Sequence, residues 1–101
     1  MEVIFGGKGK GKTTALIKIA SETGAYIVCR NQEHAQDIFE KAQNMGLIIF
    51  YPITYLEFRT FRPTVVTGRI EQSLVIDDIE AFVQSLTPIP IKAFTMDLET
   101  L

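Results

Sequence analysis

The chain alternates short apolar runs with longer segments of helical periodicity, and this order strongly constrains the fold. The apolar runs are Glu2–Phe5, Ala25–Cys29, Leu47–Phe50, Leu74–Asp77 and Ile91–Thr95. Short apolar runs without polar alternation are typical of strands buried in a parallel sheet. Parallel strands need crossover connections, which are usually helices. The order therefore predicts an α/β fold: a three-layer, doubly wound, mainly parallel sheet of about five strands, in one domain over residues 1–101.

Helical signals fill the gaps between these runs. A first helix is predicted from Lys12 to Glu22, and a second is capped by Asn31 and ended by Gly46. Thr54 and Glu57 form a capping-box pattern that opens a short helix through Phe58. A further short helix is expected over Ile79–Leu86. Residues 59–72 are predicted to be a loop with a short strand at Thr64–Val66.

A glycine-rich segment joins the first apolar run to the first helix. It consists of Gly6, Gly7, Lys8, Gly9, Lys10, Gly11, Lys12 and Thr13, followed by Thr14. Two glycines, five positions apart, precede Lys and Thr in the pattern of a phosphate-binding loop. Glycine allows the backbone N–H groups to close on an anion, and a helix N-terminus adds its positive dipole end. The segment predicts a nucleoside triphosphate site for ATP with Mg²⁺, in which Lys12 reaches the β and γ oxygens and Thr13 binds the metal.

A second motif ends the run Leu74–Asp77 in paired carboxylates. At the tip of a strand beside the glycine-rich loop, Asp77 is expected to hold Mg²⁺ through water. Asp78 is a candidate base that orients or deprotonates the attacking water, and Glu80 is the alternative. In a second interpretation, Asp78 only caps the helix that begins at Ile79.

The order of motifs resembles the first RecA-like domain of superfamily 1 helicases. Besides the glycine-rich loop, the resemblance is carried by Ile27–Asn31, Ile53–Phe58, Leu74–Glu80 and Ala93–Thr95. It implies the additional-strand group of P-loop ATPases, with the last strand inserted between the first strand and the Asp77 strand. It also implies that Thr95 senses the γ-phosphate. The chain is similar as well to small single-domain P-loop proteins of phages and mobile elements.

Two departures from the helicases bear on activity. Asp77-Asp78 stands where those helicases have Asp-Glu, and the sequence has no counterpart of their second RecA-like domain with its arginine finger. We therefore expect ATP binding with weak hydrolysis, unless a second copy or a protein partner supplies an arginine. The candidates for such an arginine are Arg59, Arg62 and Arg69, which are alternatively solvated loop charges.

Other residues carry weaker signals. Tyr51, Tyr55, Phe58 and Phe61 lie among the arginines and suit contact with single-stranded nucleic acid, although core packing is favoured for Tyr55 and Phe58. Cys29 is expected in the core and His34 on the surface.

Composition limits the remaining possibilities. The formal net charge is −2, and the chain has a single cysteine. No segment approaches the roughly 20 apolar residues of a membrane span, and Met1 leads directly into a predicted strand rather than a signal peptide. We expect a soluble protein in the cytoplasm of a bacterial or phage-infected cell, with no membrane partner.

Three functions remain open on these grounds. The first is a weak or partner-stimulated ATPase in nucleic-acid metabolism. The second is a nucleotide-dependent protein-binding module without hydrolysis, and the third is a small nucleoside kinase. No guanine-reading Asn/Thr-Lys-x-Asp pattern is present, which favours ATP over GTP.

Overall fold

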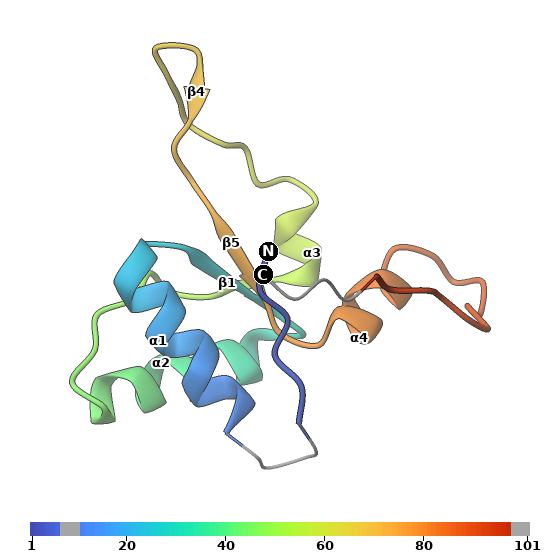
Figure 1. Cartoon of the computed structure of the whole chain (residues 1–101), viewed down its shortest axis with the longest axis horizontal. Coiled ribbons are helices and arrows are strands. Elements are labelled where there is room, and N and C mark those ends of the chain that lie inside the picture. Colours follow the sequence, from blue (N-terminus) through green and yellow to red (C-terminus); the bar gives the residue numbers. More distant parts are fainter. Residues whose placement is uncertain (7–10, 98–101) are drawn as a thin grey trace.

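The computed structural model describes residues 1–6 and 11–97 and centres on a three-stranded parallel sheet. Strand β1 (Tyr26–Cys29) lies in the middle, between β2 (Ile53–Thr54) and β5 (Leu74–Ile76). Figure 1 shows β1 beside β5. Val28 pairs with Ile53 on one side and with Ile76 on the other. The chain is thus an α/β protein whose strands end at the same edge of the sheet.

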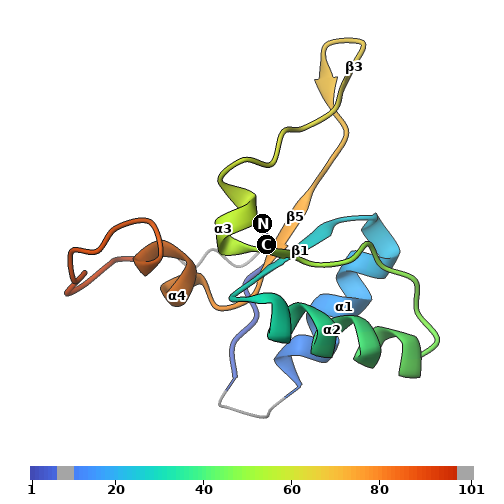
Figure 2. The ribbon, with the colours of Figure 1, turned by 180° about the vertical axis from the view of Figure 1, so that it is seen from behind.

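Helices cover both faces of this sheet. On one face lie α1 (Lys12–Thr23) and α2 (Gln32–Asn44), side by side in Figures 1 and 2. Because side chains alternate along a strand, Ile27 and Cys29 point to these two helices while Val28 points the other way. Val28 meets the short helices α3 (Tyr55–Phe58) and α4 (Ile79–Gln84). Two apolar clusters therefore pack against the sheet, one on each face.

Local capping signals place three of the helices. The Asn31 side chain accepts a hydrogen bond from the His34 N–H at 2.9 Å and starts α2. Thr54 and Glu57 form the predicted capping box at α3. Gly24 ends α1 in the left-handed region, at φ 74°. These sequence predictions are confirmed.

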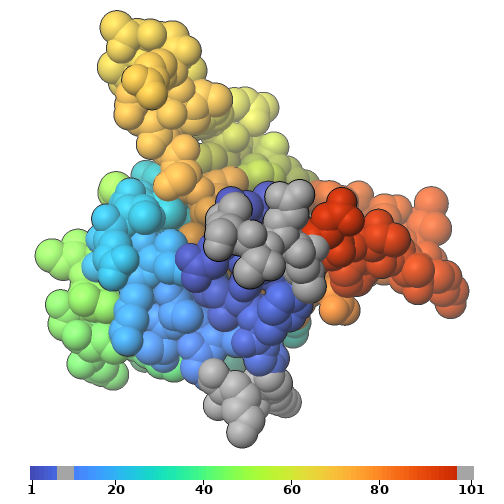
Figure 3. All heavy atoms as spheres, in the orientation of Figure 1, coloured from blue at the N-terminus to red at the C-terminus, as the bar shows by residue number. Residues whose placement is uncertain are grey.

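The segment predicted to be a loop with one short strand contains an antiparallel hairpin. Strands β3 (Val65–Val66) and β4 (Arg69–Ile70) pair with each other and stand away from the body of the molecule (Figures 1 and 3). Thr67 and Gly68 make the turn with φ of 50° and 75°. Positive φ at both central residues matches the twist of a two-residue hairpin.

Three of the predicted strands have no pairing among the described residues, so the structure does not confirm the predicted sheet of about five strands. Residues 2–5, 47–50 and 91–95 have no ladder partner among the described residues. Phe5 and Phe94 are 66% and 57% exposed, so apolar composition alone did not bring these segments into the sheet. In the middle segment only Ile49 is buried, and pairing with β1 starts at Ile53, after Pro52, which has no N–H to donate.

The described helices include none that is both long and apolar enough to cross a membrane.

Candidate functional site

A pocket of about 260 Å³ joins the start of α1 to the carboxyl end of β5. Its lining consists of Thr13, His34, Asp37, Ile38, Lys41 and Asp77. Thr13 comes from the first turn of α1, and Asp77 directly follows β5. The structure thus brings together the two residues that the sequence assigned to the metal, although they lie 64 positions apart in the chain.

Part of the glycine-rich loop lies outside the described residues. Gly7, Lys8, Gly9 and Lys10 belong to this undescribed stretch. On the far side of it, Gly11 has φ 77° and precedes Lys12, Thr13 and Thr14 in the first turn of α1. This φ is costly for residues with a side chain, which explains a glycine here. Within the described part of the chain, no side chain caps the α1 N-terminus, so its first N–H groups are suited to an anion.

Asp77 sits in an environment that disfavours its charge. Partial burial raises the pKa of the Asp77 carboxyl above its ordinary value, and the charge of Asp78 adds to this rise. The positive charges of His34, Lys12 and Arg30 lower the pKa but do not cancel the effect of burial. A divalent cation at this carboxylate would favour its ionised form.

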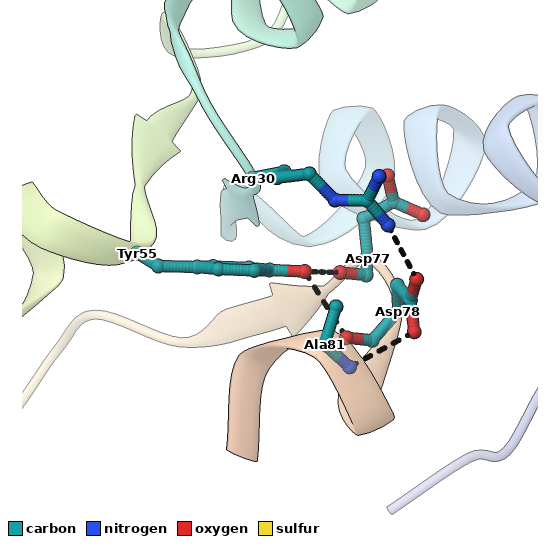
Figure 4. Close-up of polar contacts among 5 residues, drawn as sticks. All are labelled: Arg30, Tyr55, Asp77, Asp78 and Ala81. Carbon is teal, nitrogen blue, oxygen red and sulfur yellow. Dashed lines mark hydrogen bonds and ion pairs between the residues drawn. The ribbon is translucent and has the colours of Figure 1, made fainter. Parts of the chain in front are cut away.

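Asp78, the next residue, is turned away from this pocket. Its Oδ1 accepts a hydrogen bond from the Ala81 N–H at 3.1 Å, which caps α4, and its Oδ2 pairs with Arg30 at 2.9 Å (Figure 4). The alternative interpretation of Asp78 as a helix cap is therefore realised in the structure. Its role as a base stays a prediction.

Tyr55 fixes the backbone of this acidic turn. Its hydroxyl donates to the carbonyl oxygen of Asp77 at 2.5 Å and lies 3.1 Å from that of Asp78 (Figure 4). Burial, followed by the charges of Asp78 and Asp77, raises the pKa of Tyr55 to about 12. The hydroxyl is thus protonated at neutral pH and remains a donor. Sequence reasoning assigned Tyr55 to the core, and nothing in its local pattern indicated this polar contact.

His34 was expected on the surface, but it lines the pocket with Asp77. It lies in the first turn of α2, directly after β1. Strand β1 is the parallel neighbour of β5, so the residues that follow the two strands are neighbours as well. Knowledge of the strand order would have identified His34.

A second hollow of about 450 Å³ lies between α3 and α4. Its lining is Arg30, Tyr55, Leu56, Arg59, Ala81, Gln84 and Ser85. Arg59 donates a hydrogen bond to the Ser85 carbonyl oxygen and so links α3 to the end of α4. Arg62 and Arg69 are exposed, the latter in β4 of the hairpin.

The remaining predicted site residues lie elsewhere. Glu80 is exposed in the first turn of α4, and Thr95 is exposed in the C-terminal segment. Neither lines either of the two pockets. Among the described residues, no group of three or more His, Cys, Asp and Glu side chains could hold a metal by itself.

The aromatic residues that were candidates for nucleic-acid contact pack against other rings. Tyr55 is 5% exposed, and both Tyr55 and Phe58 contact Phe82 edge-on at 5.3 Å between ring centroids. The predicted core role of Tyr55 and Phe58 is thus confirmed. Tyr51 packs on Phe39, and Phe61 packs on Tyr26.

Comparison with known proteins found no matching family model, no matching curated protein and no matching solved structure.

Proposed function

We propose that this chain is a P-loop protein of the additional-strand, RecA-like group that binds ATP with Mg²⁺ and hydrolyses it slowly. The observation that carries the proposal is the pocket shared by Thr13 and Asp77, at the carboxyl edge of a parallel sheet and the start of a helix. Ligands of α/β sheets bind at this edge. The glycine-rich sequence before Thr13 supplies the matching phosphate-binding pattern.

Each residue has a distinct role in the proposal. The N–H groups of Gly6–Thr14 and the ammonium of Lys12 bind the phosphates. The Thr13 hydroxyl and the Asp77 carboxylate hold Mg²⁺, and oxygen donors of these types suit that cation. When bound, Mg²⁺ neutralises charge on the phosphates.

Hydrolysis requires a base close to the terminal phosphate. The oxygen of water forms a bond to the γ-phosphorus while the bond from that phosphorus to the bridging oxygen breaks, which leaves ADP and phosphate. The water proton passes to Asp78 or, alternatively, to Glu80. Since an arginine finger accelerates such reactions by about 10³ or more, an isolated chain turns over slowly. A second copy of the chain would supply Arg59, Arg62 or Arg69, and a different protein partner would supply an arginine of its own.

A sheet of five strands is part of the same proposal. Strand β5 pairs only with β1 among the described residues, so its other edge can accept strands. Residues 91–95 would pair there and residues 2–5 beyond them, which gives five strands and places Thr95 at the γ-phosphate. A role in nucleic-acid metabolism of a phage or mobile element follows from the resemblance to helicases.

Calorimetric titration with ATP and Mg²⁺ tests the proposal. We expect Lys12→Ala to weaken binding by at least about tenfold, since a charge-assisted hydrogen bond contributes about 1.5–3 kcal/mol. Lys18→Ala removes a cation from an exposed position of the same helix and serves as the control. Equal affinities of the Lys12 variant and the wild type would refute the proposed site.

Both carboxylate oxygens of Asp78 are bonded, one to the Ala81 N–H of α4 and the other to Arg30, so the candidate base is engaged. This observation favours a second candidate function, a nucleotide-dependent module that docks on another protein without hydrolysis. Under that alternative, purified protein binds ATP but releases no phosphate. Steady phosphate release that is lost in Asp77→Asn would argue against it.

A further inference from the structure

The carboxylate of Asp78 has a hydrogen-bond partner on each oxygen. One oxygen caps α4 through the Ala81 N–H, and the other pairs with Arg30. A carboxylate with both oxygens engaged, and outside the lining of the Thr13 pocket, is poorly placed to accept a proton there.

The two contacts of the Asp78 carboxylate differ in how easily they break. The Ala81 contact is local, three residues along the chain, whereas Arg30 reaches across from the end of the neighbouring strand β1. The side chains of Arg30 and Asp78 are 53% and 44% exposed. Exposed ion pairs contribute little net free energy, so this pair can open and close at low cost.

The backbone around Asp78 is held independently of Arg30. Asp78 has φ 62° and ψ 79°, an uncommon conformation for a residue with a side chain. The Tyr55 hydroxyl donates to the carbonyl oxygen of Asp77 on one side of the turn, and on the other side the Ala81 N–H donates to Oδ1 of Asp78. Loss of Arg30 would therefore free one carboxylate oxygen without unfolding the turn.

We propose that Arg30 is a positioning residue that restrains Asp78 and keeps ATP hydrolysis slow. Opening of the pair frees Oδ2 of Asp78 as a proton acceptor for the water beside the γ-phosphate, while Oδ1 keeps its contact with the Ala81 N–H. This inference rests on the proposed function, because it concerns the base of the same reaction.

The test measures phosphate release and ATP affinity in parallel. Arg30→Met keeps the aliphatic stem and removes the guanidinium. We expect it to raise kcat by about twofold to fivefold with KM unchanged, because an exposed ion pair restrains its partner only weakly and its loss can release no more than that restraint. Arg30→Lys retains a cation at the same place and should keep kcat near the wild-type value.

Two further variants separate this effect from a general change in structure. In Arg30→Met with Asp78→Asn, the gain in kcat should disappear, because the group that was freed is no longer a base. Lys18→Met removes an exposed cation elsewhere and should leave kcat unchanged.

The outcomes distinguish the two proposals. If the wild type binds ATP and Arg30→Met shows equal or lower kcat, the restraint by Arg30 is refuted while the nucleotide site stands. A rise in kcat that persists without the Asp78 carboxylate also refutes it. If the wild type binds no ATP, the proposed function itself fails.

Discussion

Asp77 and Asp78 are consecutive carboxylates, yet the fold gives them different surroundings. Asp77 lines the Thr13 pocket and is partly buried, whereas Asp78 is exposed and bound by Arg30 and α4. The sequence indicated both as site residues because an apolar strand that ends in two acids suits a metal site. It could not show which acid is engaged, because Arg30 lies 48 residues away in the chain.

The partial burial of Asp77 should make the free energy of unfolding depend on pH. Its pKa is higher in the folded protein than in the unfolded chain, so the folded state binds this proton more tightly. Ionisation of Asp77 therefore lowers the free energy of unfolding as the pH rises through the folded pKa, and the loss is complete above it.

In Asp77→Asn this loss is absent. We expect the variant to be more stable than the wild type at pH 7. The difference in free energy of unfolding between the two should become smaller as the pH falls toward the ordinary pKa of Asp, about 3.9. Urea denaturation at several pH values measures this difference. A difference that does not change with pH would contradict its attribution to the raised pKa of Asp77.

The hydroxyl of Tyr55 gives a second prediction at this scale. Tyr55→Phe keeps the ring packing on Phe82 but removes the donor to the Asp77 and Asp78 carbonyls. We expect the free energy of unfolding to fall by about 1 kcal/mol, the usual contribution of such a hydrogen bond. Chemical denaturation measures it, with Tyr51→Phe, at a half-exposed ring, as the matched control.

Among the elements, helices were predicted more accurately than strands. The capping residues Asn31 and Thr54 act through neighbours three positions away, so their signals are complete in the local sequence. A strand depends on a partner that is distant in the chain. Residues 91–95 have the composition of a strand, but in the structure no described strand pairs with them.

The capping box at α3 has a measurable effect. Thr54→Ala removes the acceptor for the Glu57 N–H, which is 3.1 Å from the Thr54 hydroxyl. We expect a loss of about 1 kcal/mol in the free energy of unfolding, as is typical for N-cap substitutions. Thr64→Ala, at an exposed position before β3, should change stability little. A smaller loss for Thr54→Ala than for Thr64→Ala would argue against the capping role.

On the scale of the whole molecule, the chain is less compact than its length allows. The Cα radius of gyration is 14.3 Å, against about 13 Å for a typical domain of this size. The β3–β4 hairpin and residues 86–97, which follow α4, both project from the body (Figure 3) and so extend the molecule. Their exposed apolar residues include Val65, Ile70, Ile89 and Phe94.

The proposed arginine in trans predicts a dependence on concentration. If Arg59, Arg62 or Arg69 of one copy completes the site of another, phosphate release per subunit should rise with protein concentration. Steady-state release measured over a hundredfold range of concentration, with and without single-stranded DNA, tests this. A constant rate per subunit would exclude assistance between copies.

The thiol of Cys29 can report transient opening of the sheet. It is fully buried in the central strand, and burial, with the charge of Asp77, raises the pKa of its thiol to about 11. Both effects protect it from alkylating reagents, which attack the thiolate. As the chain holds one cysteine, the alkylation rate of the intact protein reports how often its centre becomes accessible, and a bound nucleotide that stabilises the fold should slow that rate.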